Sequence, residues 1–155
     1  MKKTIKFEKG WFHNFPLKVQ TALLKLTLSA GCVQPFIKNG NWIPYIVIAI
    51  HKKTPVGWCI FFSKKEMKKI NFTASQVHFY IHKNWRKQGI ARLLGQRMIK
   101  YIKQYRSKEA VRVMPHDESS EIFFNWFVKE AKSKGVKILS GWGDDSCKYL
   151  DLIYP

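Results

Sequence analysis

Acidic residues, cysteines and long apolar runs are scarce in this chain of 155 residues. The chain has ten aspartates and glutamates and 28 lysines and arginines, which gives a formal net charge of +18. Cys32, Cys59 and Cys147 lack the paired spacing of a zinc site or a disulfide framework, so we expect buried reduced thiols and no metal. No apolar run resembles a bilayer span or a secretory signal, so we expect a cytoplasmic protein without a membrane partner.

The chain also lacks a linker rich in proline, glycine or serine, an internal repeat and a low-complexity tract. A chain of this length suits one hydrophobic core. We therefore predict a single domain over residues 1–155.

Positive charge is abundant instead, and it predicts an acidic macromolecular partner. A basic surface concentrates polyanions by electrostatic steering and counterion release, and nucleic acid, ribonucleoprotein and acidic protein all qualify. Each basic cluster can equally be an ordinary solvated face. The clusters are Lys64, Lys65, Lys68 and Lys69 in a polar connection over 64–71, and Arg92, Gln96, Lys100 and Lys103 on one face of a predicted helix.

Residues 77–94 join a strand-like run to a helical pattern through a short basic bend. The run 77–81 favours a strand, and apolar residues recur at helical spacing over 90–105. The first turn of a helix leaves backbone N–H groups unpaired, and its dipole attracts anions. Gly89 leaves room for a diphosphate, and Ala91 is nearly as small. The bend therefore predicts a phosphate-binding loop, the alternative being a core helix with basic neighbours.

The pattern Arg86-x-x-Gly89-x-Ala91 after a strand resembles the R/Q-x-x-G-x-G/A acetyl-CoA signature of the GNAT superfamily of N-acetyltransferases. The resemblance implies an α/β (α+β) fold, with a mixed, mostly antiparallel central sheet of about six to seven strands flanked by helices. The order of predicted elements agrees with it. We expect strands at 3–7, 42–50, 56–62, 77–81, 110–114, 136–139 and 147–153, and helices at 16–31, 90–105 and 119–134.

The resemblance also implies acetyl-CoA as the cofactor and direct acetyl transfer to an amine, without a covalent enzyme intermediate. By position, backbone amides over 87–92 would hold the diphosphate, and the backbone over 79–81 would pair with the pantetheine arm and face the thioester. The expected cofactor-binding residues are Phe79, Tyr80, Ile81, Arg86, Lys87, Gln88, Gly89, Ile90, Ala91 and Arg92.

The catalytic base departs from the family pattern. Members often place it on the motif strand, four or six residues before the last apolar position, where this chain has Val77 and Ser75. His78 is the substitute, although strand alternation points it away from the face of Ile81, and a hydrogen-bonded core histidine is the alternative. His116, Asp117 and Glu118 are further candidates, or else the acidic first turn of the next helix.

The general acid is missing from its usual place. Members commonly carry a tyrosine four residues before the glycine that ends the later helix, and this chain has Ala131 there. Tyr149, Ser119 and Ser120 are the candidate replacements. Coenzyme A thiolate is a good leaving group, so this departure does not by itself abolish transfer.

The predicted function is an acetyl-CoA-dependent N-acyltransferase that transfers an acetyl group to an amine, with an acidic macromolecule or its complex as acceptor. Two alternatives remain. One is an enzyme that modifies a nucleic acid directly, on a base or on aminoacyl-tRNA, and the other is a non-catalytic nucleic-acid-binding module of the same fold. The acceptor, the acyl-chain length and the oligomeric state stay open.

Overall fold

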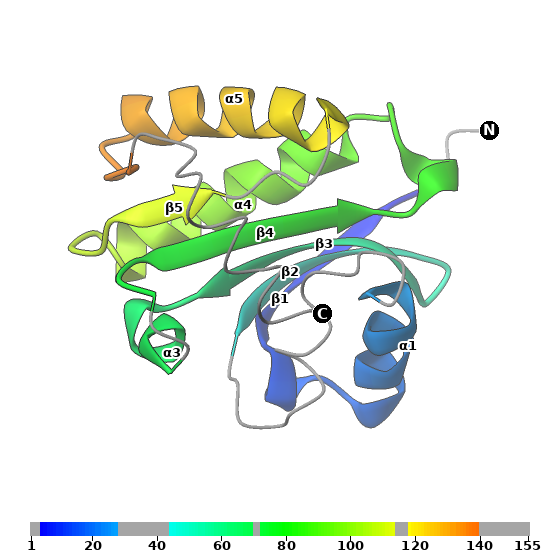
Figure 1. Ribbon diagram of the computed structural model, residues 1–155. Helices are drawn as coiled ribbons and strands as arrows, with labels where there is room; N and C mark the ends of the chain where they lie inside the picture. Colours follow the sequence, from blue (N-terminus) through cyan, green and yellow to red (C-terminus); the bar gives the residue numbers. More distant parts are fainter. Residues whose placement is uncertain (1–3, 28–43, 70–71, 114–117, 140–155) are drawn as a thin grey trace.

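The computed structural model describes residues 4–27, 44–69, 72–113 and 118–139 (Figure 1). Its strands are β1 (Lys6–Trp11), β2 (Tyr45–His51), β3 (Thr54–Phe62), β4 (Ser75–Ile81) and β5 (Val111–Val113). Its helices are α1 (Leu17–Thr27), α3 (Lys64–Lys68), α4 (Ile90–Tyr105) and α5 (Glu118–Ser133), with single 3-10 turns η1 (Phe12–Asn14) and η2 (Lys83–Trp85).

The strands form one sheet in the order β1-β2-β3-β4-β5. Neighbours from β1 to β4 are antiparallel, and β5 runs parallel to β4. This confirms the predicted mixed, mostly antiparallel sheet, with five strands in the described residues rather than six or seven. The predicted strand at 136–139 contributes only an isolated bridge between Val111 and Ile138, and the one at 147–153 lies outside the described residues.

Helices cover both faces of the sheet, with α1 and α3 on one side and α4 and α5 on the other (Figure 1). The alternation of strand side chains fills both layers: on β3, Trp58 and Phe62 join the α1 side, whereas Phe61 joins the α4 side. Phe124 and Phe127 of α5 are fully buried in the core on the α4 side.

The predicted polar connection over 64–71 is wrong in part, because it contains the helix α3. Ser63 caps this helix, and its hydroxyl accepts a hydrogen bond from the Glu66 N–H at 3.3 Å. Met67 on the same helix is fully buried against the α1 side of the sheet. Serine followed three residues later by glutamate is a local signal for a helix start.

Cys59 lies on β3 and is fully buried, as expected for a reduced structural thiol. Burial raises the pKa of its thiol, because the charged thiolate would lose its hydration. Cys32 and Cys147 lie outside the described residues. Among the described helices, none is both long and apolar enough to cross a bilayer.

Candidate functional site

Among the described residues, the second half of β4 has a strand neighbour on only one of its edges. β3 pairs with β4 from Gln76 to Ile81, whereas β5 pairs only from Ser75 to Val77. Alternate residues of an antiparallel pair point their backbone groups to opposite edges, so Phe79 and Ile81 face the β5 side. Within the part of the chain that the structure describes, their backbone groups have no strand partner there, and the Ile81 carbonyl accepts from Arg86 Nε. Such an edge can hydrogen-bond an extended amide chain. The positions predicted to pair with a pantetheine arm, 79–81, lie on this edge.

Side chains fix the orientation of that edge. Ile81 is buried on the α4 side of the sheet, and the ring of Phe79 contacts Phe123 of α5 with 3.8 Å between centroids. The half-buried Tyr80 points to the opposite, α1 side, where it packs against the second core cluster. The free edge is thus held between two packed layers, and its backbone groups have little freedom to move.

The bend after β4 is held by backbone hydrogen bonds. The His82 N–H donates to the Val56 carbonyl at 2.9 Å, and the Trp85 N–H donates to the His82 carbonyl at 2.8 Å. Arg86 closes the bend, because its Nε donates to the Ile81 carbonyl at 3.0 Å. This arrangement sets where the chain enters α4.

Two residues of the bend adopt a left-handed conformation, with φ of 60° at Lys87 and 77° at Gly89. Glycine adopts this conformation without strain, which explains its use as the N-terminal cap of α4. A Cβ atom added to Gly89 would meet no atom within 4 Å, so the space in front of the helix is open. A phosphate group can approach the backbone there.

The first turn of α4 supplies donors toward this open space. The Leu93 N–H is the first to find an acceptor within the helix, the Gly89 carbonyl at 3.3 Å. The N–H groups of Ile90, Ala91 and Arg92 have no backbone acceptor among the described residues. No acidic residue lies in this turn, and Arg86, Lys87 and Arg92 add positive charge around it. The bend therefore has the donors, the charge and the room that a diphosphate requires.

One residue of the site was missed in the sequence. Gly57 on β3 lies opposite Ile81, and a Cβ atom there would come within 2.6 Å of Ile81 Cδ1 and 3.0 Å of the Tyr80 carbonyl oxygen. Gly57 thus allows the free end of β4 to lie close to β3. A glycine inside an apolar, strand-forming run is the signal that could have revealed it.

His78 lies where strand alternation predicts, on the α1 side of β4 and away from the face of Ile81. Its imidazole is fully buried, contacts the Phe62 ring, and has Nε2 3.0 Å from Oε1 of Gln76. The hydrogen bond to Gln76 fixes the orientation of the ring.

The other acid–base candidates are less fully described. Glu118 is the first residue of α5, His116 and Tyr149 lie outside the described residues, and only the backbone of Ser119 and Ser120 is placed. Ala131 is fully buried and has no hydroxyl to offer. In the residues that the structure covers, no group of three or more histidine, cysteine or acidic side chains could hold a metal ion.

Comparisons with known proteins agree with this geometry. The model of the Acetyltransferase (GNAT) family matches residues 20–127. A ribosomal-protein-alanine N-acetyltransferase from Brucella melitensis biovar Abortus 2308 has a similar fold, with a TM-score of 0.55, 16% identity, and coverage of 91% of this chain and 96% of that one. An aminoglycoside acetyltransferase from an uncultured soil metagenomic sample has a TM-score of 0.52, 15% identity, and coverage of 91% and 95%.

A search of curated proteins gives no match. The family match spans more than half of the chain and includes β4, the bend and α4. GNAT acetyltransferases use acetyl-CoA as cosubstrate, which agrees with a bend suited to a diphosphate. The protein therefore belongs to the GNAT acetyltransferase family.

Proposed function

We propose that this protein is an acetyl-CoA-dependent N-acetyltransferase that passes an acetyl group directly to an amine. The observation that carries the proposal is the continuity of three features: the free edge of β4, the bend, and the open first turn of α4. Together they offer backbone partners for a long amide-containing arm that ends in a diphosphate. Acetyl-CoA has this shape, and its thioester supplies an activated acetyl group.

In this proposal, backbone groups make most of the contacts with the cofactor. The N–H groups over 87–92 bind the diphosphate, with Arg86, Lys87 and Arg92 supplying charge. The backbone over 79–81 binds the arm and orients the thioester, and an N–H group of this edge polarises its carbonyl. A bound acyl donor positioned in this way needs no covalent attachment to the protein.

We propose His78 as the group that takes the proton from the attacking amine. It is the one acid–base candidate whose side chain the structure describes, and Gln76 holds its ring in place. His78 is fully buried on the α1 side of β4, so in this proposal the proton reaches its imidazole from that side of the sheet. Ala131 replaces the usual tyrosine, so the thiolate leaves without a proton from that helix position.

The acceptor is proposed to be an amine on an acidic macromolecule or its complex. The net charge of +18 supports this, because it exceeds what a single anionic cofactor requires. The two structurally similar enzymes are named for a ribosomal-protein alanine and for aminoglycosides, so this fold serves both macromolecular and small acceptors.

Two measurements test the proposal. Calorimetry with coenzyme A should show saturable binding, and release of free thiol from acetyl-CoA should rise above the acceptor-free rate with one pool of peptides, polyamines, transfer RNA or DNA. His78→Asn should keep the affinity for coenzyme A and lose thiol release. Binding without thiol release in any pool would favour the non-catalytic module, and no binding at saturating coenzyme A would overturn the assigned site.

A further inference from the structure

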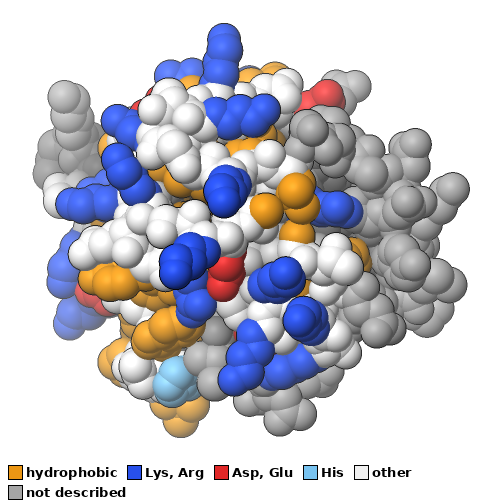
Figure 2. Space-filling view, turned by 90° about the vertical axis from the view of Figure 1, so that its left-hand side faces the viewer, with side chains coloured by type: hydrophobic (Ala, Val, Ile, Leu, Met, Phe, Trp, Pro, Cys, Tyr) orange, Lys and Arg blue, Asp and Glu red, His pale blue; other side chains and the backbone are white. Residues whose placement is uncertain are grey.

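The end of the molecule opposite the bend carries a strongly basic surface, which we call the basic end face. Figure 2, which views the molecule from the left-hand side of Figure 1, shows lysine and arginine side chains spread across this face, with a small acidic area near its middle. Three parts of the chain contribute to it: α3 and its end, the end of α4, and the end of α5. The residues are Lys64, Lys65, Lys68, Lys69, Lys103, Arg106, Lys108, Lys132, Lys134 and Lys137.

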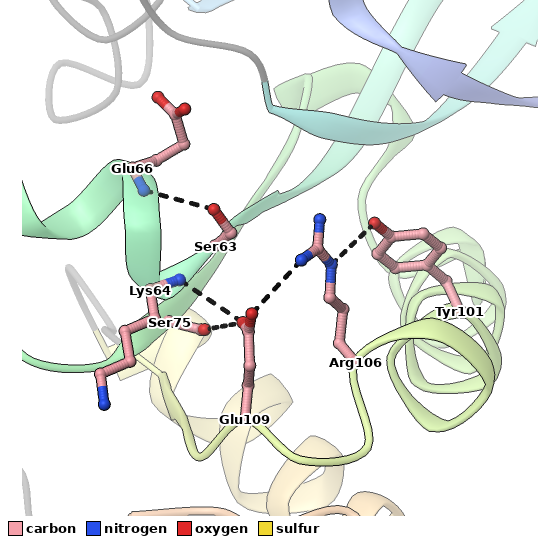
Figure 3. Close-up of polar contacts among 7 residues, drawn as sticks. All are labelled: Ser63, Lys64, Glu66, Ser75, Tyr101, Arg106 and Glu109. Carbon is pink, nitrogen blue, oxygen red and sulfur yellow. Dashed lines mark hydrogen bonds and ion pairs between the residues drawn. The ribbon is translucent and has the colours of Figure 1, made fainter.

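Glu109 binds two of these parts together (Figure 3). Its carboxylate accepts hydrogen bonds from the Ser75 hydroxyl at the start of β4, from the backbone N–H of Lys64 at 3.4 Å, and from a guanidinium N–H of Arg106 at 3.3 Å. The third part is joined through β5, where the Val111 N–H donates to the Lys137 carbonyl at 2.8 Å. The lysines therefore share one face because of tertiary contacts between distant segments.

The carboxylates at this end are already paired. Glu66 lies 2.9 Å from Lys69, Glu109 lies 3.3 Å from Arg106, and Glu130 lies 4.0 Å from Lys134, measured between charged atoms. Among the described residues, the remaining lysines have no carboxylate at ion-pair distance: Lys64, Lys65, Lys68, Lys103, Lys108, Lys132 and Lys137. This face therefore has a large excess of positive charge for a partner to neutralise.

An exposed aromatic ring stands among these charges. Tyr105, in the last turn of α4 between Lys103 and Arg106, is 65% exposed. Its ring lies 5.5 Å from that of Tyr101, which stacks on Tyr45 with 3.5 Å between centroids. Arg106 reinforces this support, because its Nε donates to the Tyr101 hydroxyl at 3.4 Å. Tyr105 is thus a supported platform on which a flat ring can stack.

We propose that the basic end face binds single-stranded nucleic acid. Its lysines would contact the phosphates, and a base would stack on Tyr105. Charge alone would suit an acidic protein equally well, but an exposed tyrosine backed by other rings favours an unpaired base. The surface is separate from the bend, because α4 places them roughly 24 Å apart along its 16 residues. The proposal does not rest on acetyl transfer, and it holds whether or not the enzymatic proposal does.

Fluorescence anisotropy with a labelled oligouridylate of about 12 nucleotides, titrated between about 50 and 200 mM salt, tests the proposal. The double variant Lys65→Glu/Lys68→Glu should weaken binding by about tenfold or more and reduce the salt slope by about 1.4. The matched control is Lys18→Glu/Lys25→Glu on α1, which makes the same change of charge on exposed lysines of another face and should alter affinity less than about twofold. Circular dichroism checks that each variant is folded.

A second variant separates nucleic acid from other polyanions. Tyr105→Ala should weaken binding of the oligouridylate about fivefold or more and leave the salt slope unchanged, because stacking releases no counterions. Its effect on binding of polyglutamate should be negligible. Equal loss in the two lysine variants would overturn the location of the site. Polyglutamate binding as tight as that of the oligouridylate, with no effect of Tyr105→Ala on either, would overturn the assignment to nucleic acid.

Discussion

The two ends of the central sheet differ in the chemical groups they offer: mostly backbone groups at one end and charged side chains at the other. At the end where β4 runs into α4, the candidate site consists of backbone donors, a left-handed glycine and, within the described residues, a strand edge with no strand partner. At the other end, they are long cationic side chains and a carboxylate that joins separate elements. A site made of backbone groups tolerates most side-chain substitutions, and it loses binding when a large side chain fills the space in front of those groups. A site made of side chains is sensitive to each change of charge.

The largest expected effect tests the backbone site. Gly89→Trp should reduce the affinity for coenzyme A by about 100-fold or more, because the side chain would fill the open space in front of α4. The matched control is Gly135→Trp, since Gly135 has a φ of 81° and also nothing within 4 Å of an added Cβ. Both variants carry the same backbone strain, so calorimetry isolates the blocking effect. Equal affinity for coenzyme A in the two variants would refute the assigned loop.

The next effect tests the carboxylate at the basic end. Glu109→Ala should lower the free energy of unfolding by about 2 kcal/mol, because the fully buried Ser75 and the Arg106 guanidinium lose their acceptor. Urea unfolding measures this. In contrast, Glu8→Ala removes an exposed pair with Lys6 and should cost less than about 0.5 kcal/mol. A similar loss from both variants would show that Glu109 does not organise this end.

A smaller effect tests whether the Arg86 side chain contributes to coenzyme A binding at the bend. Arg86→Met removes the hydrogen bond to the Ile81 carbonyl that closes the bend, and should weaken coenzyme A binding about fivefold. Arg97→Met is the control, because Arg97 carries the same charge on α4 but packs over the Phe7 ring at 4.1 Å. Its affinity for coenzyme A should stay within about twofold of the unmodified protein. If the two variants behave alike, Arg86 contributes only charge.

The smallest effect concerns the middle of the sheet, between the two ends. In a Cys32→Ser/Cys147→Ser variant, Cys59 should resist iodoacetamide at about pH 8 until the protein unfolds, because burial raises the pKa of the thiol and blocks access. Mass spectrometry with and without urea measures this. Rapid alkylation of the folded variant would show that the layers around β3 open readily.

Local patterns predicted some elements well. The motif helix was predicted over 90–105, and α4 has those bounds, because its apolar spacing and its glycine act within a few residues. The first strand was predicted at 3–7 but runs from Lys6 to Trp11, because its position is set by pairing with β2, from Ile50 to Tyr45. The start of α3 was missed although Ser63 and Glu66 form a local signal.

The candidate site also has parts that local sequence indicates and parts that depend on strand pairing. The bend and the glycine that opens α4 were recognised from adjacent residues. The free edge of β4 could not be, because it exists only where the short β5 stops pairing at Val77. The role of Gly57 was hidden too, since the need for a missing Cβ arises from its neighbour Ile81 across the sheet.

The sequence by itself determined the basic bend with its glycine, the main helices and the large positive charge. Hydrogen bonds in turns and helices join residues within about four positions, and charge is a matter of composition. Only the tertiary structure decided that, within the described residues, β4 has no strand partner on the edge beside that bend, and that lysines from three separate segments gather at the opposite end around Glu109. Strand pairing and side-chain clusters join residues far apart in the chain, so their geometry appears only once the sheet has formed.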